Sequence, residues 1–433
     1  MESNETVRHG PSEYPLDSWD WDQLRQVADE HGTPVYVYDL DRLVDNYQRL
    51  ESVLDDWTVK YAAKANWNGA VVSTLRDIGA KLVCASPFEF RRFLDLGVPV
   101  EDIQYTAVHP SDEYVQRVCA LSTESGGGAA TETAATVTVG SLDTLEKFLA
   151  AGFEGDVFVR VNSNYLTDDD TLTPHNAKFG IPPARVSRAV ARLGDEPASF
   201  VGLHVHTGEM STAEEMEEFY TVVENTAQLV SELSVRVERL DLGGGLRVPF
   251  ARGDTPVDLP RVYRTVERLL SGFDGRVVLE PGKYVVADAG TTLTTVTSVK
   301  ETPVGTVVGV DLPAHLLPSP VMWEEPHRLY NLSAPDAPER TQTVSGPSCT
   351  WYNGYIGLER RFSESSVGDC LGVNMTGAYG HSMASTFHMT PRPPIVALRD
   401  GRATLVRERD SLETVVGPER ELSDCSPDSL RQY

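Results

Sequence analysis

The stretch "VKYAAKANWNGAVVSTLRDIGAKLVCAS" (residues 59–86) contains the pattern from which the fold class can be predicted. Two short runs rich in β-forming residues, "VKYAAK" (59–64) and "KLVCAS" (81–86), flank the helix-like segment "VVSTLRDIG". A strand, a helix and a second strand in this order predict parallel strands joined by a helical crossover. Lys64 stands at the end of the first strand, although only 7 of the 38 basic residues in the chain are lysines.

The same alternation continues along the first 290 residues. Six further strand-like runs are "IQYTAVH" (103–109), "TVTVG" (136–140), "VFVRVN" (157–162), "VGLHVHT" (201–207), "RLDLGGG" (239–245) and "RVVLEPG" (276–282). Helix-like segments lie between most of them, for example "SLDTLEKFLAAG", with Ser141 as N-cap and Gly152 as the stop. Eight strands alternating with helices predict a (β/α)8 TIM barrel, with a doubly wound open sheet as the alternative.

The sequence pattern changes after about residue 290. Runs such as "TTLTTVTSVKETPVGTVVGVD" and "IVALRDGRATLVRERD" alternate apolar and polar residues, which predicts a C-terminal antiparallel β domain. The early strand "PVYVYDL" (34–40) is expected to pair with that domain. We therefore predict an N-terminal segment over 1–40, a barrel over 41–290 and a β domain over 291–433. The low-complexity segment 122–136 is expected to be a mobile surface insertion.

Composition excludes several classes of partner. The formal net charge of −26 argues against binding to nucleic acid or to an anionic membrane. Acidic residues spread along the whole chain, together with the excess of Arg over Lys, are typical of proteins from salt-loving microbes. No run of about 18 apolar residues and no signal peptide are evident, so we expect a cytoplasmic protein. Five cysteines without C-x-x-C spacing indicate a reducing compartment without a disulfide framework or zinc site: Cys84, Cys119, Cys349, Cys370 and Cys425.

The predicted strand ends carry reactive or small residues. The active site of such a barrel lies at the C-terminal ends of its strands. Read in chain order, these ends are Lys64, Ser86, His109, Asn162, His206, Gly243 to Gly245 and Glu280. The three glycines of "DLGGGL" would let backbone N–H groups approach an anion such as a phosphate, although tight turns also use glycine.

Two further motifs leave several roles open. His204 and His206 alternate on one strand, which fits a metal pair completed by Glu280 and His109, packed histidines, or an imidazole stacked on a flat cofactor ring. Glu280 ends an apolar strand, where an unpaired carboxylate would be costly. It needs a positive or proton-donating partner, and an ion pair with a barrel arginine such as Arg160 is the simplest one.

One cofactor accounts for all of these residues together. Lys64 would form a Schiff base with pyridoxal phosphate, and Gly243 to Gly245 would hold its phosphate. His206 would stack on the ring, and Glu280 would pair with the ring nitrogen. We therefore predict a pyridoxal 5'-phosphate enzyme, with no metal in the site.

The motifs also resemble a known family. "YAAKAN", "CAS" followed by Glu89, "VRVN", "AKFGIP", "GLHVHTG", "LDLGGGL", "EPGKYVVADAG", "SGPSC" and "GAYGHSMAS" occur in the family's order over roughly residues 30 to 410. The chain resembles the fold-type III pyridoxal-phosphate decarboxylases, the ornithine/diaminopimelate/arginine decarboxylase family, and is most similar to their diaminopimelate-specific members.

The resemblance implies roles for individual residues. It makes Lys64 the Schiff-base lysine, His206 the ring-stacking histidine and Glu280 the partner of the pyridine nitrogen. Further cofactor contacts are expected from Ser86, Arg160, Gly243, Gly244, Gly245 and Tyr379. Cys349 would enter the neighbouring subunit's site and help to protonate the product carbon, so the resemblance implies a homodimer with composite sites.

Glu280 also indicates the type of reaction. Loss of CO2 leaves a carbanion that the cofactor ring accepts as an electron sink. A carboxylate that keeps the ring nitrogen protonated strengthens the sink and favours decarboxylation. Alanine racemase, which resembles this barrel, places an arginine there. Glu280 therefore predicts a carboxy-lyase.

The residues expected at the substrate end depart from the family pattern. Thr350 follows Cys349 where the diaminopimelate enzymes have glutamate, and Lys283 replaces an arginine that clamps a carboxylate. Ser319 aligns with a second clamp arginine, and Glu209 replaces a serine. The substrate-binding residues expected from this alignment are Lys283, Ser319, Trp323, Thr350 and Tyr379. Arg328, Glu324 or His381 could supply the missing charges instead.

These departures leave the substrate open. The best single expectation is conversion of meso-diaminopimelate to L-lysine and CO2. The alternative is the same chemistry on another amino acid or a conjugate from a siderophore, polyamine or antibiotic pathway. A barrel metallohydrolase and a non-catalytic pyridoxal-phosphate carrier are more remote alternatives.

Overall fold

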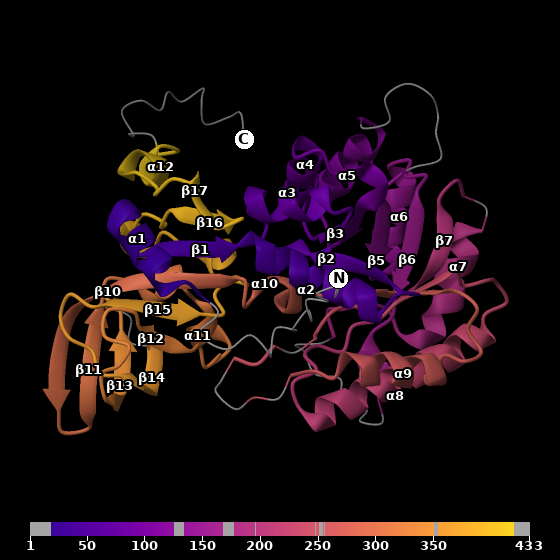
Figure 1. Ribbon diagram of the computed structural model, residues 1–433. Helices are drawn as coiled ribbons and strands as arrows, with labels where there is room; N and C mark the ends of the chain where they lie inside the picture. The colour runs from indigo at the N-terminus through magenta and orange to yellow at the C-terminus, as the bar shows by residue number, and fades with distance from the viewer. Residues whose placement is uncertain are drawn as a thin grey trace, which may run out of the picture. The chain divides into compact units, whose positions relative to one another are not determined.

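The eight strand-like runs predicted for the barrel all form strands in the computed structural model of the protein (Figure 1). The structure describes residues 19–124, 134–167, 177–194, 196–246, 248–250, 254, 256–349 and 354–419. The chain divides into two units. Of the described residues, those between 40 and 249 and between 254 and 288 form the barrel unit, and residues 19–39, 250 and those between 289 and 419 form the sheet unit. Residues 125–133 of the predicted surface insertion lie outside the described residues.

The barrel unit is a closed parallel β-barrel. Its eight strands in the described chain are β2 (Thr58–Ala62), β3 (Lys81–Cys84), β4 (Ile103–Thr106), β5 (Thr136–Val139), β6 (Asp156–Arg160), β7 (Ser199–His204), β8 (Arg239–Asp241) and β9 (Arg276–Leu279). Each strand pairs in parallel with the next, and the pairing of Thr58 with Val278 closes the barrel. Most of these strand residues are buried, as expected of parallel strands covered on both faces. The prediction of a TIM barrel is confirmed, and the open sheet is excluded.

Helices precede, connect and follow the barrel strands. They are α2 (Leu40–Val53), α3 (Gly69–Asp77), α4 (Pro87–Asp95), α5 (Asp112–Glu124), α6 (Leu142–Ala150), α7 (Val186–Leu193), α8 (Ala213–Glu232), α9 (Leu259–Leu269) and α10 (Lys283–Val286). The side chain of Ser141 accepts the N–H of Thr144 at 2.9 Å and caps α6, as the sequence predicted. Gly152, just beyond that helix, has a φ of +75°, which explains why a glycine ends the segment.

The sheet unit contains most of the remaining elements. They are α1 (Trp21–His31), β1 (Val35–Asp39), β10 (Gly290–Thr302), β11 (Gly305–Val310), α11 (Ser319–Met322), β12 (Leu329–Asn331), β13 (Glu339–Ser345), β14 (Tyr355–Ser363), β15 (Cys370–Asn374), β16 (Ile395–Arg399), β17 (Arg402–Arg407) and α12 (Leu412–Val416). A core of apolar side chains beneath α1 holds this unit together, with Val35, Val37, Leu293 and Val396 all shielded from water.

The sheet of this unit is mixed rather than purely antiparallel. Its order is β14-β13-β11-β10-β1-β16-β17, with β15 beside β10 and β12 beside β15. The hairpins β10–β11 and β16–β17 are antiparallel, as their alternation predicted. The pairs β1–β16 and β11–β13 are parallel, and in both pairs the long connection that parallel strands require separates the two strands in the chain.

No helix in the described ranges is long and apolar enough to cross a membrane.

Candidate active site

Lys64 lies in a one-turn 3₁₀ helix, Ala63–Ala65 (η2), directly after β2. The residue is exposed to solvent, yet the pKa of its ammonium is lowered from the ordinary value. Loss of hydration among crowded protein groups is the largest cause, with Glu280 opposing the shift and Arg160 adding to it. An accessible amine that loses its proton readily can attack an aldehyde.

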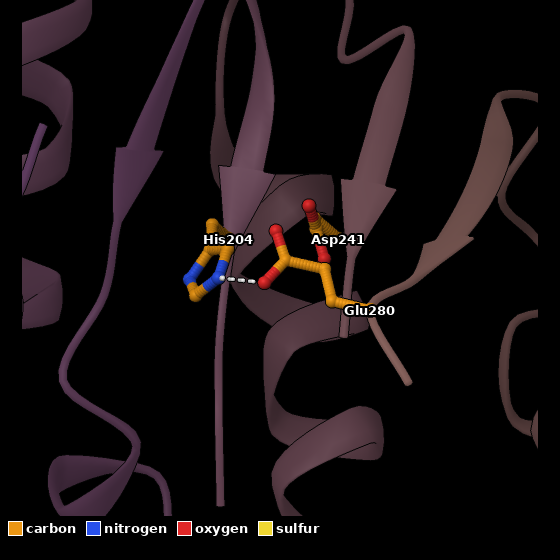
Figure 2. A group of neighbouring side chains, drawn as sticks. All are labelled: His204, Asp241 and Glu280. Carbon is orange, nitrogen blue, oxygen red and sulfur yellow. Dashed lines mark ion pairs between the residues drawn. The ribbon is translucent and has the colours of Figure 1, made fainter. Parts of the chain in front are cut away.

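Glu280 directly follows β9 and belongs to a buried cluster with His204 and Asp241. Figure 2 shows the Glu280 carboxylate between these two side chains, and its Oε2 lies 3.7 Å from Nε2 of His204. Burial lowers the pKa of His204 to about 3, so the imidazole is neutral and this contact is not a salt bridge. Burial, together with the neighbouring Glu280 carboxylate, raises the pKa of Asp241 to about 7.

The side chain of Gln104 on β4 links the two carboxylates. Its Nε2 donates to Glu280 Oε1 at 2.7 Å and to Asp241 Oδ2 at 3.0 Å. Its Oε1 accepts a hydrogen bond from Nζ of Lys60 on β2. The sequence analysis did not single out Lys60, Gln104 or Asp241. The available signal was the two-residue period of "VKYAAK", which places Lys60 on the strand face opposite Val59 and Tyr61.

The glycines after β8 form a turn that tolerates no side chain. The φ angles of Gly243 and Gly245 are +70° and +113°. A Cβ on Gly244 would lie 2.3 Å from the carbonyl oxygen of Glu280, and one on Gly243 would lie 2.6 Å from Nδ1 of His206. The turn therefore packs closely against both residues. The N–H of Gly243 donates to Asp241 Oδ1 at 2.9 Å, which fixes the start of the turn.

His206 and Arg160 approach Lys64 from neighbouring strands. Arg160 ends β6, and His206 follows the end of β7 by two residues. Loss of hydration is the largest cause of the strongly lowered pKa of His206, and the charges of Lys64 and Arg160 add to it. His206 is therefore neutral, which suits packing against a ring. The guanidinium of Arg160 lies 4.7 Å from the ring centre of Phe179.

Ser86 has a structural contact in the described chain. Its hydroxyl accepts the N–H of Glu89 at 3.1 Å and caps α4. The carboxylate of Glu89 in turn accepts the N–H of Ala85 at 2.7 Å, which completes a reciprocal cap. Burial raises the pKa of Glu89, and the charge of Lys64 opposes that shift. The cap therefore lies close enough to Lys64 for an electrostatic interaction.

Two substitutions noted in the sequence form one ion pair. Nζ of Lys283, in the first turn of α10, contacts Oε1 of Glu209. The Lys283 side chain is 14% exposed and that of Glu209 is 55% exposed. The replacements of an arginine and a serine in the family pattern are thus physically linked in this chain.

The remaining predicted site residues belong to the sheet unit. Cys349 is exposed, and its Sγ lies 3.2 Å from Nε2 of His388, a residue with a φ of +58°. The sequence analysis missed His388, which lies 39 positions away in the chain. Thr350 lies outside the described residues.

The other three predicted residues of this unit have internal contacts. Ser319 is fully buried, and its hydroxyl bonds to Nε2 of His327 at 2.8 Å. The rings of Trp323 and Tyr379 contact each other edge to face, with centres 4.9 Å apart. The structure therefore brings Trp323 and Tyr379 together and surrounds Ser319 with protein.

The suggested replacements for the missing charges are also in this unit. Nε of Arg328 donates to the carbonyl of Phe250 at 3.2 Å. Burial lowers the pKa of His381 to about 3, so this side chain brings no charge at neutral pH. Glu324 is exposed and has a φ of +54°.

A metal site was one reading of the paired histidines. Among the residues that the structure describes, the group whose geometry could hold an ion is His204, Asp241 and Glu280, with ligand atoms within 4.8 Å of one another. Gln104 donates hydrogen bonds to Oε1 of Glu280 and Oδ2 of Asp241, so both carboxylates already serve as hydrogen-bond acceptors. The predicted fourth ligand, His109, is exposed on its loop. The arrangement therefore fits a hydrogen-bonded cofactor partner better than a set of metal ligands.

Comparison with known proteins gives the family. Residues 40–287 match the family model described as "Pyridoxal-dependent decarboxylase, pyridoxal binding domain". The chain belongs to this family. The decarboxylase is therefore a pyridoxal-phosphate-dependent carboxy-lyase that acts on an amino acid, as the sequence analysis predicted.

Individual relatives cover nearly the whole decarboxylase. The diaminopimelate decarboxylase of Methanothermobacter thermautotrophicus is 30% identical over 90% of this chain and 92% of its own length. That of Escherichia coli K12 is 27% identical over 92% and 96%. The crystal structure of diaminopimelate decarboxylase from Helicobacter pylori complexed with L-lysine superposes with a TM-score of 0.81 over 92% and 98%, at 22% identity.

The barrel residues fit pyridoxal phosphate. Lys64 offers an accessible amine with a lowered pKa. The glycine turn leaves room that a Cβ on its glycines would occupy, and Glu280 supplies a buried carboxylate. These three features are at the same end of one barrel, where the chemistry of this family requires them together.

Proposed function

We propose that this decarboxylase converts meso-diaminopimelate to L-lysine and CO2. The observation that carries the proposal is the coverage of its relatives. Proteins named diaminopimelate decarboxylase align over at least nine tenths of both chains, barrel and sheet unit together. A shared substrate is the simplest reason for a likeness that extends beyond the cofactor-binding barrel.

Each of the barrel residues would have its own role in the reaction. Pyridoxal phosphate, when bound, supplies the electron sink that accepts the charge left by departing CO2. Lys64 would hold the cofactor and release it to the substrate amine, helped by the lowered pKa of its ammonium. Glu280 would accept a hydrogen bond from the ring nitrogen and keep a proton there. The neutral imidazole of His206 would pack on the ring.

The glycine turn would bind the cofactor phosphate. Because Asp241 already occupies the N–H of Gly243, we assign the phosphate mainly to the amides of Gly244 and Gly245. Ser86, Arg160 and Tyr379 are proposed as further cofactor contacts.

The active enzyme is proposed to be a homodimer. Cys349 would protonate the product carbon in the neighbouring subunit's site, and its contact with His388 supplies a nearby group for proton exchange. We propose no nucleic acid partner, because a net charge of −26 repels a polyanion.

A second candidate is the same reaction on another amino acid or conjugate. The ion pair between Lys283 and Glu209 favours it. A lysine lacks the bidentate fork with which arginine holds a carboxylate. Glu209 also balances its charge, so this position attracts a distal substrate carboxylate less strongly than an arginine would. Trp323 and Thr350 are the further residues proposed to contact the distal group, whereas Ser319, expected there from the sequence, is fully buried against His327.

A CO2-release screen separates the two candidates. The purified protein, loaded with pyridoxal phosphate, would be supplied in turn with meso-diaminopimelate, lysine, ornithine, arginine and carboxylated conjugates. We expect the highest kcat/KM with meso-diaminopimelate. A higher kcat/KM for another compound would make that compound the proposed substrate. If CO2 is released from none of the compounds, this substrate class is excluded.

A further inference from the structure

The interior of the barrel contains a buried lysine that the proposed chemistry does not use. Lys60 on β2 is only 6% exposed, and its Nζ lies 5.5 Å from the ring centre of Phe158 on β6. The interior of such barrels is usually filled by bulky branched side chains. A charged amine there is costly unless it is paired or hydrogen-bonded. Lys60 therefore requires a physical explanation.

A chain of hydrogen bonds connects Lys60 with Glu280. Nζ of Lys60 donates to Oε1 of Gln104, and Nε2 of Gln104 donates to Glu280 Oε1 at 2.7 Å. The same Nε2 lies 3.0 Å from Asp241 Oδ2 and 3.1 Å from Thr138 Oγ1. All five side chains are buried, so water does not compete for these bonds.

The chemistry of the ammonium group gives this chain a direction. An ammonium group can only donate hydrogen bonds, so the Gln104 atom facing it must be the amide oxygen. The NH2 group of Gln104 must then face the two carboxylates. Without Lys60, the amide could turn over and present its oxygen to Glu280, and that contact requires a proton on the carboxyl group.

Charged groups of both signs act on the ammonium group of Lys60. Burial lowers the pKa of Lys60 to about 8, while Asp241 and Glu280 oppose the shift and Arg239 and Lys81 add to it. Lys60 is therefore mostly charged at neutral pH. Glu280 also interacts with His204, Lys64 and Arg160. Lys60 is thus a second lysine, besides Lys64, whose charge acts on Glu280, and it also acts on Asp241.

We propose that Lys60 is a positioning residue of the decarboxylation, which acts through Gln104 to keep Glu280 ionised and correctly oriented. The inference rests on the proposed role of Glu280 as partner of the cofactor's ring nitrogen. Lys60 and Gln104 touch neither cofactor nor substrate. They determine which protonation state of Glu280 the bound cofactor meets.

The test compares Lys60→Met with Lys81→Met in the loaded enzyme. Lys81 is the parallel register partner of Lys60 on β3, but its side chain is 41% exposed and pairs with Asp102. Both variants remove one positive charge from adjacent strands. The readouts are the pH midpoint of the absorption band of the bound cofactor without substrate, and kcat and KM for CO2 release.

We expect only Lys60→Met to move both readouts. Its pH midpoint falls by about one unit, because a less anionic Glu280 holds the ring proton less well. Its kcat falls roughly tenfold, with a smaller change in KM. Lys60→Arg keeps a cation that only donates hydrogen bonds. It should therefore retain much of the pH midpoint and of the kcat that Lys60→Met loses. Equal effects of Lys60→Met and Lys81→Met would overturn the proposal.

A double-mutant cycle tests the path through Gln104. Gln104→Leu removes the donor to Glu280 and is expected to change both readouts at least as much as Lys60→Met. In that background Lys60→Met should add nothing, whereas additive effects would mean that Lys60 does not act through Gln104. If Lys60→Met does not fold, Lys60→Gln replaces it in the cycle, with the same two outcomes.

A third variant separates this inference from the proposed function. Glu280→Gln removes the ring partner itself. If it changes neither readout, the role of Glu280 is wrong and the inference fails with it. If it changes both readouts while Lys60→Met matches Lys81→Met, only the inference about Lys60 is wrong.

Discussion

The cofactor end of the barrel, which contains Lys64, Gly243 to Gly245 and Glu280, and the Lys283–Glu209 pair are held in place in very different ways. Glu280 is 8% exposed and receives contacts from Gln104, Asp241 and His204. The Lys283–Glu209 pair joins a largely buried amine to a carboxylate that is 55% exposed. A change at the cofactor end disturbs several strands together, whereas a change at the pair disturbs little else. Substrate preference can therefore vary while the cofactor chemistry is retained.

Lys64→Ala is expected to have the largest effect at the cofactor end. Without this amine the protein loses its covalent hold on the cofactor, and kcat falls by roughly a thousandfold or more. The measurements are the visible absorption of the purified protein and CO2 release. Lys81→Ala, which removes a half-exposed lysine of β3, is the matched control. An unchanged absorption band in Lys64→Ala would contradict the assignment of this lysine.

Glu280→Gln is expected to have the next largest effect. An amide does not keep the ring nitrogen protonated, so kcat should fall by roughly a hundredfold while the cofactor stays bound. Glu267→Gln serves as control, because Glu267, on α9, accepts a hydrogen bond from Trp57 at 2.7 Å and is not among the groups that contact Glu280. If cofactor affinity falls while kcat of the saturated enzyme is unchanged, Glu280 binds the cofactor without activating it.

Asp241 should give the protein without cofactor a pH-dependent stability. Its pKa is raised to about 7 in the folded chain, from an ordinary value near 4. The raised pKa therefore contributes stability that is complete below about pH 4 and is lost as the pH rises through about 7. Asp241→Asn lacks this titration. Its stability relative to the natural chain should increase between pH 5 and pH 8 by up to roughly 2 kcal/mol.

Thermal unfolding of both proteins across that pH range measures the difference. Asp156→Asn is the control, because Asp156 is only partly buried and pairs with Arg239 at 2.8 Å. A pH-independent difference between Asp241→Asn and the natural chain would mean that Asp241 is already ionised well below pH 7.

The sequence predicted the barrel because its signal is local. Most strand-like runs, such as 59–64, are followed by a helix-like segment, and the residues at the strand ends follow from the order of the elements. The sequence also predicted that the strand at residues 34–40 pairs with the C-terminal domain, and β1 does pair with β10 and β16. The choice of β16 and the parallel direction were not predicted, because the pairing joins Tyr36 to Ile395 and local sequence patterns carry no information on so distant a contact. The mixed sheet is therefore a feature of the tertiary fold.

The same limit explains which site residues were missed. Lys64 and Glu280 stand at strand ends, where a charged residue next to an apolar run is conspicuous. Lys60 and Gln104 lie inside strands from different βα units, and their contact depends on strand register and on which face points inward. Sequence alone gives the alternation of faces but does not give the register.

The Lys283–Glu209 pair should give the smallest effect, and it tests substrate choice. Lys283→Arg combined with Glu209→Ser restores the residue types of the family pattern. If a distal carboxylate binds there, KM for meso-diaminopimelate should fall about threefold, in line with the modest energies of partly exposed ion pairs. Asp156→Ser breaks an ion pair at the opposite ends of the barrel strands and is the control. A higher KM would mean that Glu209 itself binds the substrate, as an ammonium group would require, and would favour a substrate whose distal group is cationic.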